Sequence, residues 1–195
     1  MGLDERRRVR RERLLAAGVD LIGAVDGSAA SVRAVCRAAG LTERYFYESF
    51  PDRDAFVRGV YADVGKRARD ALVTAVEAAP RSGRAEAAVR AFVELMVDKP
   101  AMGRVLLLAP LREATISNRG VELAPMFVSL VDEQLPGIGD PAERHMVAVG
   151  LVGALTSLFM GYLDGAVAVP REVLVRHCVR LLEQAADDGQ ERWSG

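Results

Sequence analysis

The most constraining feature of this sequence is the stretch 31–50, SVRAVCRAAGLTERYFYESF, in which a glycine separates two short helical patterns. Ser31 belongs to the residue types that cap helices, and apolar residues then recur at helical spacing as far as Ala39. Gly40 can take the left-handed conformation that ends a helix, and Thr42 can cap a second one. Two short helices joined by a tight glycine turn predict a helix-turn-helix.

The second helix of this pair carries its polar and aromatic residues at its N-terminal end. Glu43, Arg44 and Tyr45 point outward from its first turn, whereas Phe46 and Phe50 point back toward a core. A recognition helix contacts base edges in the major groove with its N-terminal residues. The pattern therefore predicts that Glu43, Arg44 and Tyr45 face the bases of duplex DNA.

The same stretch, with the residues that follow it, resembles the DNA-binding domain of TetR-type repressors. The resemblance rests on the run 39–42 (AGLT), the aromatic triplet 45–47 (YFY) and the segment 50–56 (FPDRDAF), and it covers roughly residues 8–60. These motifs recur at several fixed spacings, so the similarity is specific. It implies a helical regulator that binds double-stranded DNA as a homodimer.

The sequence departs from the family pattern at three positions. Arg53 stands where the family usually has lysine, Ser49 stands where histidine or tyrosine is common, and Phe46 occupies a variable position. Arg53 keeps the positive charge, whereas Ser49 keeps only a hydroxyl group. The resemblance implies contacts to the DNA backbone from Arg10, Arg11, Ser31, Arg33, Thr42, Tyr47, Ser49 and Arg53.

Charge is distributed unevenly along the chain. Residues 6–13 contain six arginines and a single acid, Glu12. Residues 1–53 hold ten basic and eight acidic residues, whereas the rest of the chain holds 16 basic and 19 acidic residues. A solvated charge run is the alternative interpretation, but the adjacent helix-turn-helix favours phosphate contact through this end of the chain.

The long apolar patterns elsewhere in the chain have helical spacing, and no segment has a convincing strand period. Short breaks rich in proline and glycine separate them. We therefore expect an all-α fold of about nine helices. The resemblance implies a helix-turn-helix DNA-binding domain over 1–52 and a helical ligand-binding and dimerisation domain over 53–195. Expected helices cover 5–25, 51–79, a segment ending before Pro100, a segment ending at Pro110, and 121–135, with a loop or frayed helix end at 111–120.

The stretch 145–163 (HMVAVGLVGALTSLFMGYL) has no charged residue when histidine is neutral, and it is about as long as a membrane span. Small residues recur in it at steps of three and four, which lets a second helix approach closely in a membrane or in a soluble interface. The nearby charges of Arg144 and Asp164 favour a buried dimer helix. The resemblance implies that this stretch and 173–182 form the dimer interface, through Gly150, Gly153, Ala154, Ser157, Gly161, Leu174 and Leu181.

The middle helices offer apolar and sulfur-containing side chains that can line a ligand cavity. Helical spacing shows an apolar face rather than a cavity, so ordinary core packing is the alternative for most of these residues. The predicted ligand-binding residues are Phe92, Met96, Met102, Arg104, Met126, Phe127 and Phe159.

No motif in the sequence predicts catalysis, a cofactor or a metal site. His145 and His177 lie in helical patterns without a nucleophile or a glycine-rich phosphate loop nearby. Cys36 and Cys178 are predicted to be buried thiols in a reducing compartment. The charged N-terminus is not followed by an apolar segment of the kind found in secretory signals, so we expect a cytoplasmic protein outside the membrane.

The resemblance, together with the basic N-terminal end, implies a homodimeric TetR-like repressor that binds a palindromic operator and is released by a small apolar ligand. Whether such a regulator represses or activates, and which ligand it binds, is left open by the sequence. Two other classes stay open as well: a helical enzyme that keeps the helix-turn-helix as a scaffold, and a module that uses the same aromatic surface to bind protein.

Overall fold

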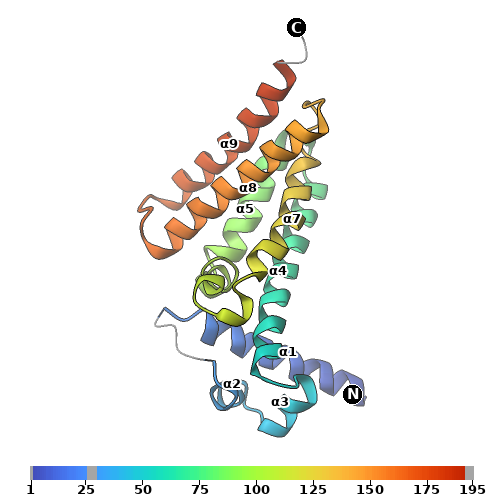
Figure 1. The fold of residues 1–195 in the computed structure, drawn as a ribbon, viewed down its shortest axis with the longest axis vertical. Helices are drawn as coiled ribbons and strands as arrows, with labels where there is room; N and C mark the ends of the chain where they lie inside the picture. Colours follow the sequence, from blue (N-terminus) through green and yellow to red (C-terminus); the bar gives the residue numbers. More distant parts are fainter. Residues whose placement is uncertain (1, 26–29, 192–195) are drawn as a thin grey trace. The chain divides into compact units, whose positions relative to one another are not determined.

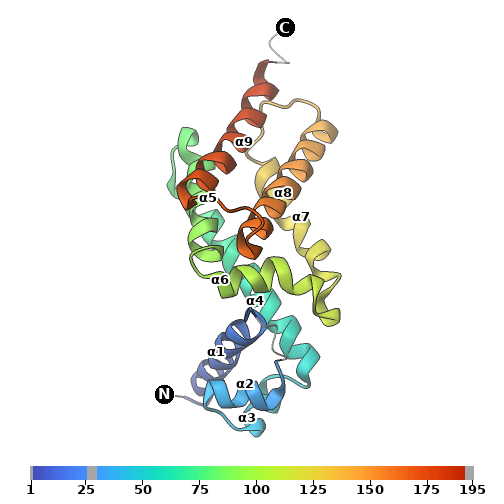
Figure 2. The ribbon, with the colours of Figure 1, turned by 90° about the vertical axis from the view of Figure 1, so that its left-hand side faces the viewer.

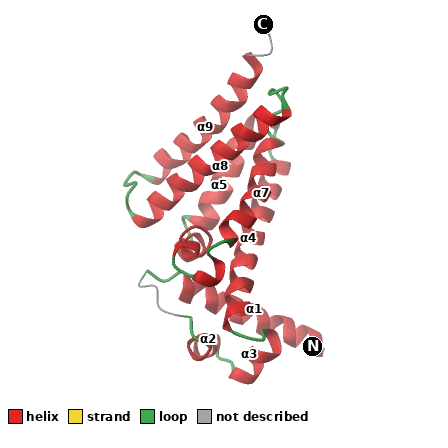
Figure 3. Cartoon of the chain, in the orientation of Figure 1, coloured by secondary structure: helices red, strands yellow, loops and turns green. Residues whose placement is uncertain are grey.

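The structure, a computed structural model, describes residues 2–25 and 30–191, and in that range it contains nine α-helices and no strand (Figures 1 and 3). The predicted all-α fold is confirmed. The helices are α1 Leu3–Ile22, α2 Val32–Ala39, α3 Glu43–Ser49, α4 Arg53–Ala78, α5 Arg84–Met96, α6 Pro100–Gly103, α7 Arg119–Asp132, α8 Pro141–Asp164 and α9 Arg171–Glu191.

The chain divides into two compact units. The first, here the head unit, comprises Met1–Arg67 and Lys99–Arg119. The second, the body unit, comprises Ala68–Asp98 and Gly120–Gly195. Helix α4 therefore contributes residues 53–67 to the head unit and residues 68–78 to the body unit.

Helices α1, α2 and α3 pack together in the head unit (Figure 2). Aromatic side chains from α3, from the residue after it and from α4 contact one another there. The ring centroids of Phe46 and Phe56 are 5.3 Å apart, and Phe50 lies within 5.8 Å of both. Gly18 lets α1 approach α4 closely: a Cβ at this position would lie 2.5 Å from Val60 Cγ2. These contacts fix the helix-turn-helix against α4, because buried side chains of this size leave little room for movement.

Residues 99–119 join the head unit as an irregular segment. The sequence predicts one helix that ends at Pro110, whereas the structure has the short helix α6, a π-helical turn at Arg104–Leu108, and 3-10 turns at Ala109–Leu111 and Ala114–Ile116. Proline at position 110 cannot donate a backbone hydrogen bond, which favours the change to tighter turns. Arg104 Nε donates to the backbone oxygen of Gly23 at 2.6 Å and so ties this segment to the end of α1.

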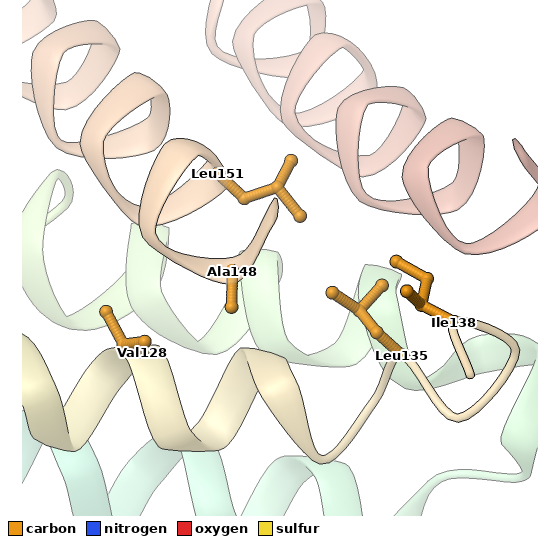
Figure 4. Close-up of a cluster of buried hydrophobic side chains, with 5 residues drawn as sticks. All are labelled: Val128, Leu135, Ile138, Ala148 and Leu151. Atoms are coloured by element: carbon orange, nitrogen blue, oxygen red, sulfur yellow. The ribbon is translucent and has the colours of Figure 1, made fainter. Parts of the chain in front are cut away.

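The body unit contains α5, α7, α8 and α9 with the last turns of α4. Helices α8 and α9 run antiparallel, and α9 also packs on α5 (Figure 1). One apolar cluster joins α7, the loop after it and α8 (Figure 4). Its buried members are Val128, Leu135, Ile138, Ala148 and Leu151, and Leu181 of α9 packs against them.

Helix α8 has an unusual balance of length, hydropathy and exposure. Among the described residues it is the one helix of 18 residues or more that is long and apolar enough to cross a membrane, with a mean hydropathy of 1.9 in its most apolar window. Only 11% of that window is buried inside the chain. An apolar face of α8 is therefore left uncovered by the rest of the chain.

Candidate nucleic-acid interface

The turn between α2 and α3 has the geometry that its sequence predicts. Ser31 Oγ accepts from the backbone N–H of Ala34 at 3.2 Å, so Ser31 caps α2. Gly40 has φ +61° and ψ +41°, the left-handed conformation that ends α2. Thr42 occupies the N-cap position of α3, although its side chain makes no capping hydrogen bond.

A third helix supports this turn from outside. Arg13 of α1 donates through Nη2 to the backbone oxygen of Ala39 at 2.6 Å, which satisfies one of the carbonyl groups left free at the end of α2. Leu41 N–H donates to Cys36 O at 2.9 Å and satisfies another. The orientation of α3 relative to α2 is thus held by the backbone and by α1 together.

Helix α3 turns a polar face outward and an aromatic face inward. Phe46 is fully buried, whereas the Arg44 side chain is 85% exposed. Tyr47 is 54% exposed, and its ring packs edge-on against Phe46 at 5.4 Å. The predicted base-facing residue Arg44 and the predicted phosphate-contacting residue Tyr47 are therefore both open to a ligand.

Arg10 of α1 extends this polar face. Its guanidinium lies 4.4 Å from the centre of the Tyr45 ring, and its Nη2 lies 3.4 Å from Glu48 Oε2. Arg44 Nε donates to the other oxygen of Glu48 at 3.3 Å. Sequence reasoning did not assign a role to Glu48, although its position four residues after Arg44 is a readable sign of a helical ion pair.

Two further arginines sit at the edges of this surface. Arg11 lies over the Phe50 ring at 4.3 Å and donates to the backbone oxygen of Ser49 at 3.2 Å. Arg33 of α2, whose side chain is 91% exposed, lies 3.4 Å from a carboxylate oxygen of Glu43. Arg11 thus covers the end of α3, and Arg33 borders its beginning.

Arg53 begins α4 and is held by two hydrogen bonds. Its Nε donates to the backbone oxygen of Ala30 at 3.2 Å, and its Nη2 donates to Glu113 Oε1 at 2.9 Å. The Arg53 side chain is 33% exposed. Glu113 lies far away in the sequence, so no local pattern indicated this partner.

The head unit contains every residue predicted to contact DNA, on α1, α2, α3 and the start of α4. None of their roles is tested by the fold itself, so each stays a prediction. Most of these side chains are exposed, whereas Arg10, Tyr45, Ser49 and Arg53 are half-buried.

The predicted ligand-binding residues fall into both units. In the body unit, the Phe92 ring lies 4.7 Å from that of Phe159 and 6.5 Å from that of Phe127. Met96 is fully buried and Met126 is half-buried. Met102 and Arg104 belong to the head unit. The three phenylalanines thus lie close together in the body unit, and their role in ligand binding stays a prediction.

The body unit also has an open polar pocket formed by α7 and α8. None of the predicted ligand-binding residues lines it. Its lining residues are Ser129, Asp132, Glu133, Pro141, Arg144 and His145. Among the residues that the structure describes, no group of three or more His, Cys, Asp or Glu side chains could hold a metal ion.

The predicted dimer residues divide by exposure. Gly150, Gly153, Ala154 and Ser157 are exposed on one face of α8. Leu174 keeps only 2% of its exposure and Leu181 is half-buried, so both pack inside their own chain. Gly161 is half-buried too, beside Val167.

Both cysteines are buried, and burial raises their thiol pKa values. The pKa of Cys178 rises to about 11, because the thiolate would lie in an apolar environment. The pKa of Cys36 also rises, mainly through burial and secondly through the charge of Glu43. Both thiols are therefore protonated at neutral pH and unsuited to nucleophilic chemistry.

Solved structures with the same arrangement of helices come from bacterial regulators. A transcriptional regulator from Rhodococcus sp. Rha1 superposes with a TM-score of 0.75 at 18% identity, covering 92% of this chain and 97% of that one. A TetR-like transcriptional regulator from Rhodococcus sp. RHA1 gives a TM-score of 0.68 at 19% identity, covering 93% and 95%.

The chain has the TetR-type regulator fold. A fatty acid degradation regulator from Bacillus halodurans is similar too, with a TM-score of 0.74 at 16% identity over 88% of this chain and 96% of that one. No protein-family model matches the sequence, and no curated protein matches it. The TetR-type fold thus spans nearly the whole chain, at 16 to 19% sequence identity to these structures.

Proposed function

We propose that this protein is a cytoplasmic TetR-like transcriptional repressor that binds a palindromic DNA operator as a homodimer and is released by a small apolar ligand. The observation that carries the proposal is the outward face of α3. Arg44 and Tyr47 are exposed on it, and the buried Phe46 holds it in place. A short helix with this arrangement suits insertion into the major groove.

Base contacts in the proposal come from Glu43, Arg44 and Tyr45. An arginine donates two hydrogen bonds to the O6 and N7 atoms of guanine, which is the most frequent specific contact in protein–DNA complexes. Phosphate contacts come from the surrounding helices and set the register of α3 in the groove. This second set consists of Arg10, Arg11, Ser31, Arg33, Thr42, Tyr47, Ser49 and Arg53.

Dimerisation supplies the second half of the operator contact. One helix-turn-helix reads only a few base pairs, whereas two of them spaced by one DNA turn, about 34 to 36 Å, read a palindrome. The exposed face of α8 supports the dimer, because Met146 and Val149 are 67% and 48% exposed beside Gly150 and Gly153. Apolar faces of this kind in a soluble chain mark interaction sites.

Release by a ligand requires two conformations of the protein that differ in their affinity for DNA. A small apolar molecule bound among Phe92, Phe127 and Phe159 of the body unit would favour a conformation with lower DNA affinity. Helix α4 contributes to both units, so it is the element through which we expect this preference to act.

Selection from a random pool of DNA duplexes tests the proposed function. The purified protein should enrich a palindromic sequence, and a duplex of that sequence should shift the protein in a gel at a stoichiometry of two chains per duplex. Light scattering in the absence of detergent should give the mass of a dimer. The proposal would be wrong if the protein enriched no sequence and had the mass of a monomer. A protein that could be kept in solution only with detergent would instead favour a membrane role for α8.

A further inference from the structure

Glu48 connects two arginines of the candidate nucleic-acid interface through a single carboxylate. Its Oε1 accepts from Arg44 Nε at 3.3 Å, and its Oε2 lies 3.4 Å from Arg10 Nη2. Arg10 belongs to α1, whereas Arg44 and Glu48 belong to α3. Glu48 therefore links α3, the proposed recognition helix, to α1.

The two arginines differ in how far they can move. The side chain of Arg10 is only 21% exposed, because the Tyr45 ring covers its guanidinium from one side and Glu48 holds its end. The side chain of Arg44 is 85% exposed and is held at Nε alone. Arg10 is thus a fixed support for Glu48, and Arg44 is the group that Glu48 directs outward.

The chemistry of the guanidinium group gives this contact a consequence. Arginine has five N–H donors in a planar fork, and a donor pair is needed to bind O6 and N7 of guanine together. When Nε donates to Glu48, the two terminal nitrogens of Arg44 stay available as such a pair. Without Glu48, Arg44 would be free to rotate toward phosphate groups, which carry no sequence information.

The negative charge of Glu48 also favours selective binding over non-specific binding. A carboxylate on the DNA-facing helix lowers the attraction for every phosphate nearby, and this attraction supplies most non-specific binding. Glu48 thus reduces affinity for any duplex while it keeps the geometry that distinguishes guanine.

We infer that Glu48 is a positioning residue that sets base selectivity: it orients Arg44 toward a guanine and suppresses binding to unrelated DNA. This inference rests on the proposed DNA-binding function.

The test compares the parent protein with Glu48→Gln, which has nearly the same shape and lacks the charge. The probes are a duplex enriched by the parent protein from a random pool, its single-base variants, and an unrelated duplex of equal length. The Glu48→Gln variant should bind the unrelated duplex about 3-fold more tightly at low salt. Its plot of log affinity against log salt concentration should also be steeper, by about the amount that one additional phosphate contact contributes. Discrimination at the base pair read by Arg44 should fall about 5-fold or more.

Asp20 provides a matched control for charge alone. It is exposed near the C-terminal end of α1, ten residues or about 15 Å along the helix from Arg10. Asp20→Asn removes one negative charge from the same unit, and it should leave the base preferences and the salt dependence near those of the parent protein. Far-UV circular dichroism confirms that each variant stays helical.

A double-mutant cycle separates positioning from direct base contact. Glu48→Gln in an Arg44→Ala background should have no additional effect on discrimination, because both changes remove the same guanine contact. An additional loss of the same size as in the parent background would overturn the inference, and so would unchanged preferences in Glu48→Gln alone. If the parent protein enriches no sequence, the proposed function fails instead, and this inference falls with it.

Discussion

Arg53 and Glu113 are 60 residues apart in the sequence, yet Arg53 Nη2 donates to Glu113 Oε1 at 2.9 Å. Both side chains are largely covered, with 33% and 25% of their exposure left. The pair ties the first residue of α4 to the irregular segment 99–119, and it lies within the head unit. A second contact, Thr115 Oγ1 to Asp54 Oδ1 at 3.1 Å, joins the same two segments.

We expect this ion pair to stabilise the head unit measurably. A double-mutant cycle of Arg53→Ala and Glu113→Ala should give a coupling energy of about 1 kcal/mol in urea unfolding, the upper end of the range for partly exposed pairs. The matched control is Arg8 with Glu12 on α1, whose side chains are 59% and 52% exposed. The coupling there should be clearly smaller, because water and salt screen two exposed charges. Equal coupling energies at the two sites would contradict this prediction.

The predicted DNA contacts can be separated by their dependence on sequence. Tyr47→Ala combined with Arg53→Ala should weaken binding to all duplexes by a similar factor and reduce the salt dependence, because both side chains are assigned to phosphates. Arg44→Ala should cost about 1 to 3 kcal/mol at one base pair and relax selectivity there. Fluorescence anisotropy with single-base variants of the enriched duplex measures both effects.

The control for this comparison is Tyr47→Phe, which keeps the ring contact with Phe46 and removes only the hydroxyl group. Its affinity should fall by a similar, smaller factor for all duplexes, without a change in base preference. Parent-like affinity in the Tyr47 and Arg53 double variant would show that the phosphate assignments are wrong.

Two glycines of α8 should respond oppositely to substitution. A Cβ at Gly153 would meet no atom of its own chain within 4 Å, whereas a Cβ at Gly161 would lie 2.8 Å from Val167 Cγ2. Gly153→Arg should therefore leave the helical content intact and convert the proposed dimer to a monomer in light scattering. Gly161→Ala should keep the dimer and lower the free energy of unfolding by about 1 kcal/mol through the internal clash.

The sizes of these effects also distinguish the two faces of α8. Replacing glycine inside a helix raises intrinsic helix propensity by up to about 1 kcal/mol, so a monomeric Gly153→Arg variant with normal helicity identifies the loss of an interface rather than of the helix. A Gly153→Arg protein that stays dimeric would place the dimer contact elsewhere.

Cys178 should make stability depend on alkaline pH. Its folded-state pKa of about 11 lies above the ordinary value of 9.0, because the thiol is buried. Below pH 9 both states hold the proton, whereas between pH 9 and pH 11 only the unfolded state loses it. The free energy of unfolding should fall by about 1.4 kcal/mol per pH unit in this window.

Urea unfolding at pH 8, 9, 10 and 11 checks this slope, with Cys178→Ala as the reference. The substitution leaves a small cavity and so lowers stability at pH 8, where the thiol is protonated in both states, but it should remove this part of the decline above pH 9. Identical pH profiles for the two proteins would exclude Cys178 as the source.

Much of the head unit follows from local sequence signals. Ser31 and Gly40 behave as their types predict, one as a helix cap and the other as a left-handed stop. The alternation of Arg44 and Phe46 between solvent and core follows from helical spacing alone. Such features involve residues within a few positions of each other, so they can be inferred without a fold.

The helix over 100–110 shows where local signals end. Its apolar pattern is helical, yet it divides into α6, a π-helical turn and 3-10 turns. Packing against α1 supplies partners such as Gly23 O, which accepts from Arg104. Hydrogen bonds of this kind compensate for the irregular backbone, and no window of the sequence contains both partners.

The amino-acid sequence by itself determined the helical class, the capped glycine turn and the polar face of α3, because each depends on interactions within one or two helical turns. Only the tertiary structure decided that Glu48 joins Arg10 to Arg44, that Glu113 holds Arg53, and that α8 keeps an exposed face of small residues. These relationships depend on which distant segments the buried aromatic and aliphatic side chains bring together. The hydrophobic effect has no preferred direction, so the shape of the whole core decides which segments pack together. A pattern along the sequence therefore does not reveal these contacts.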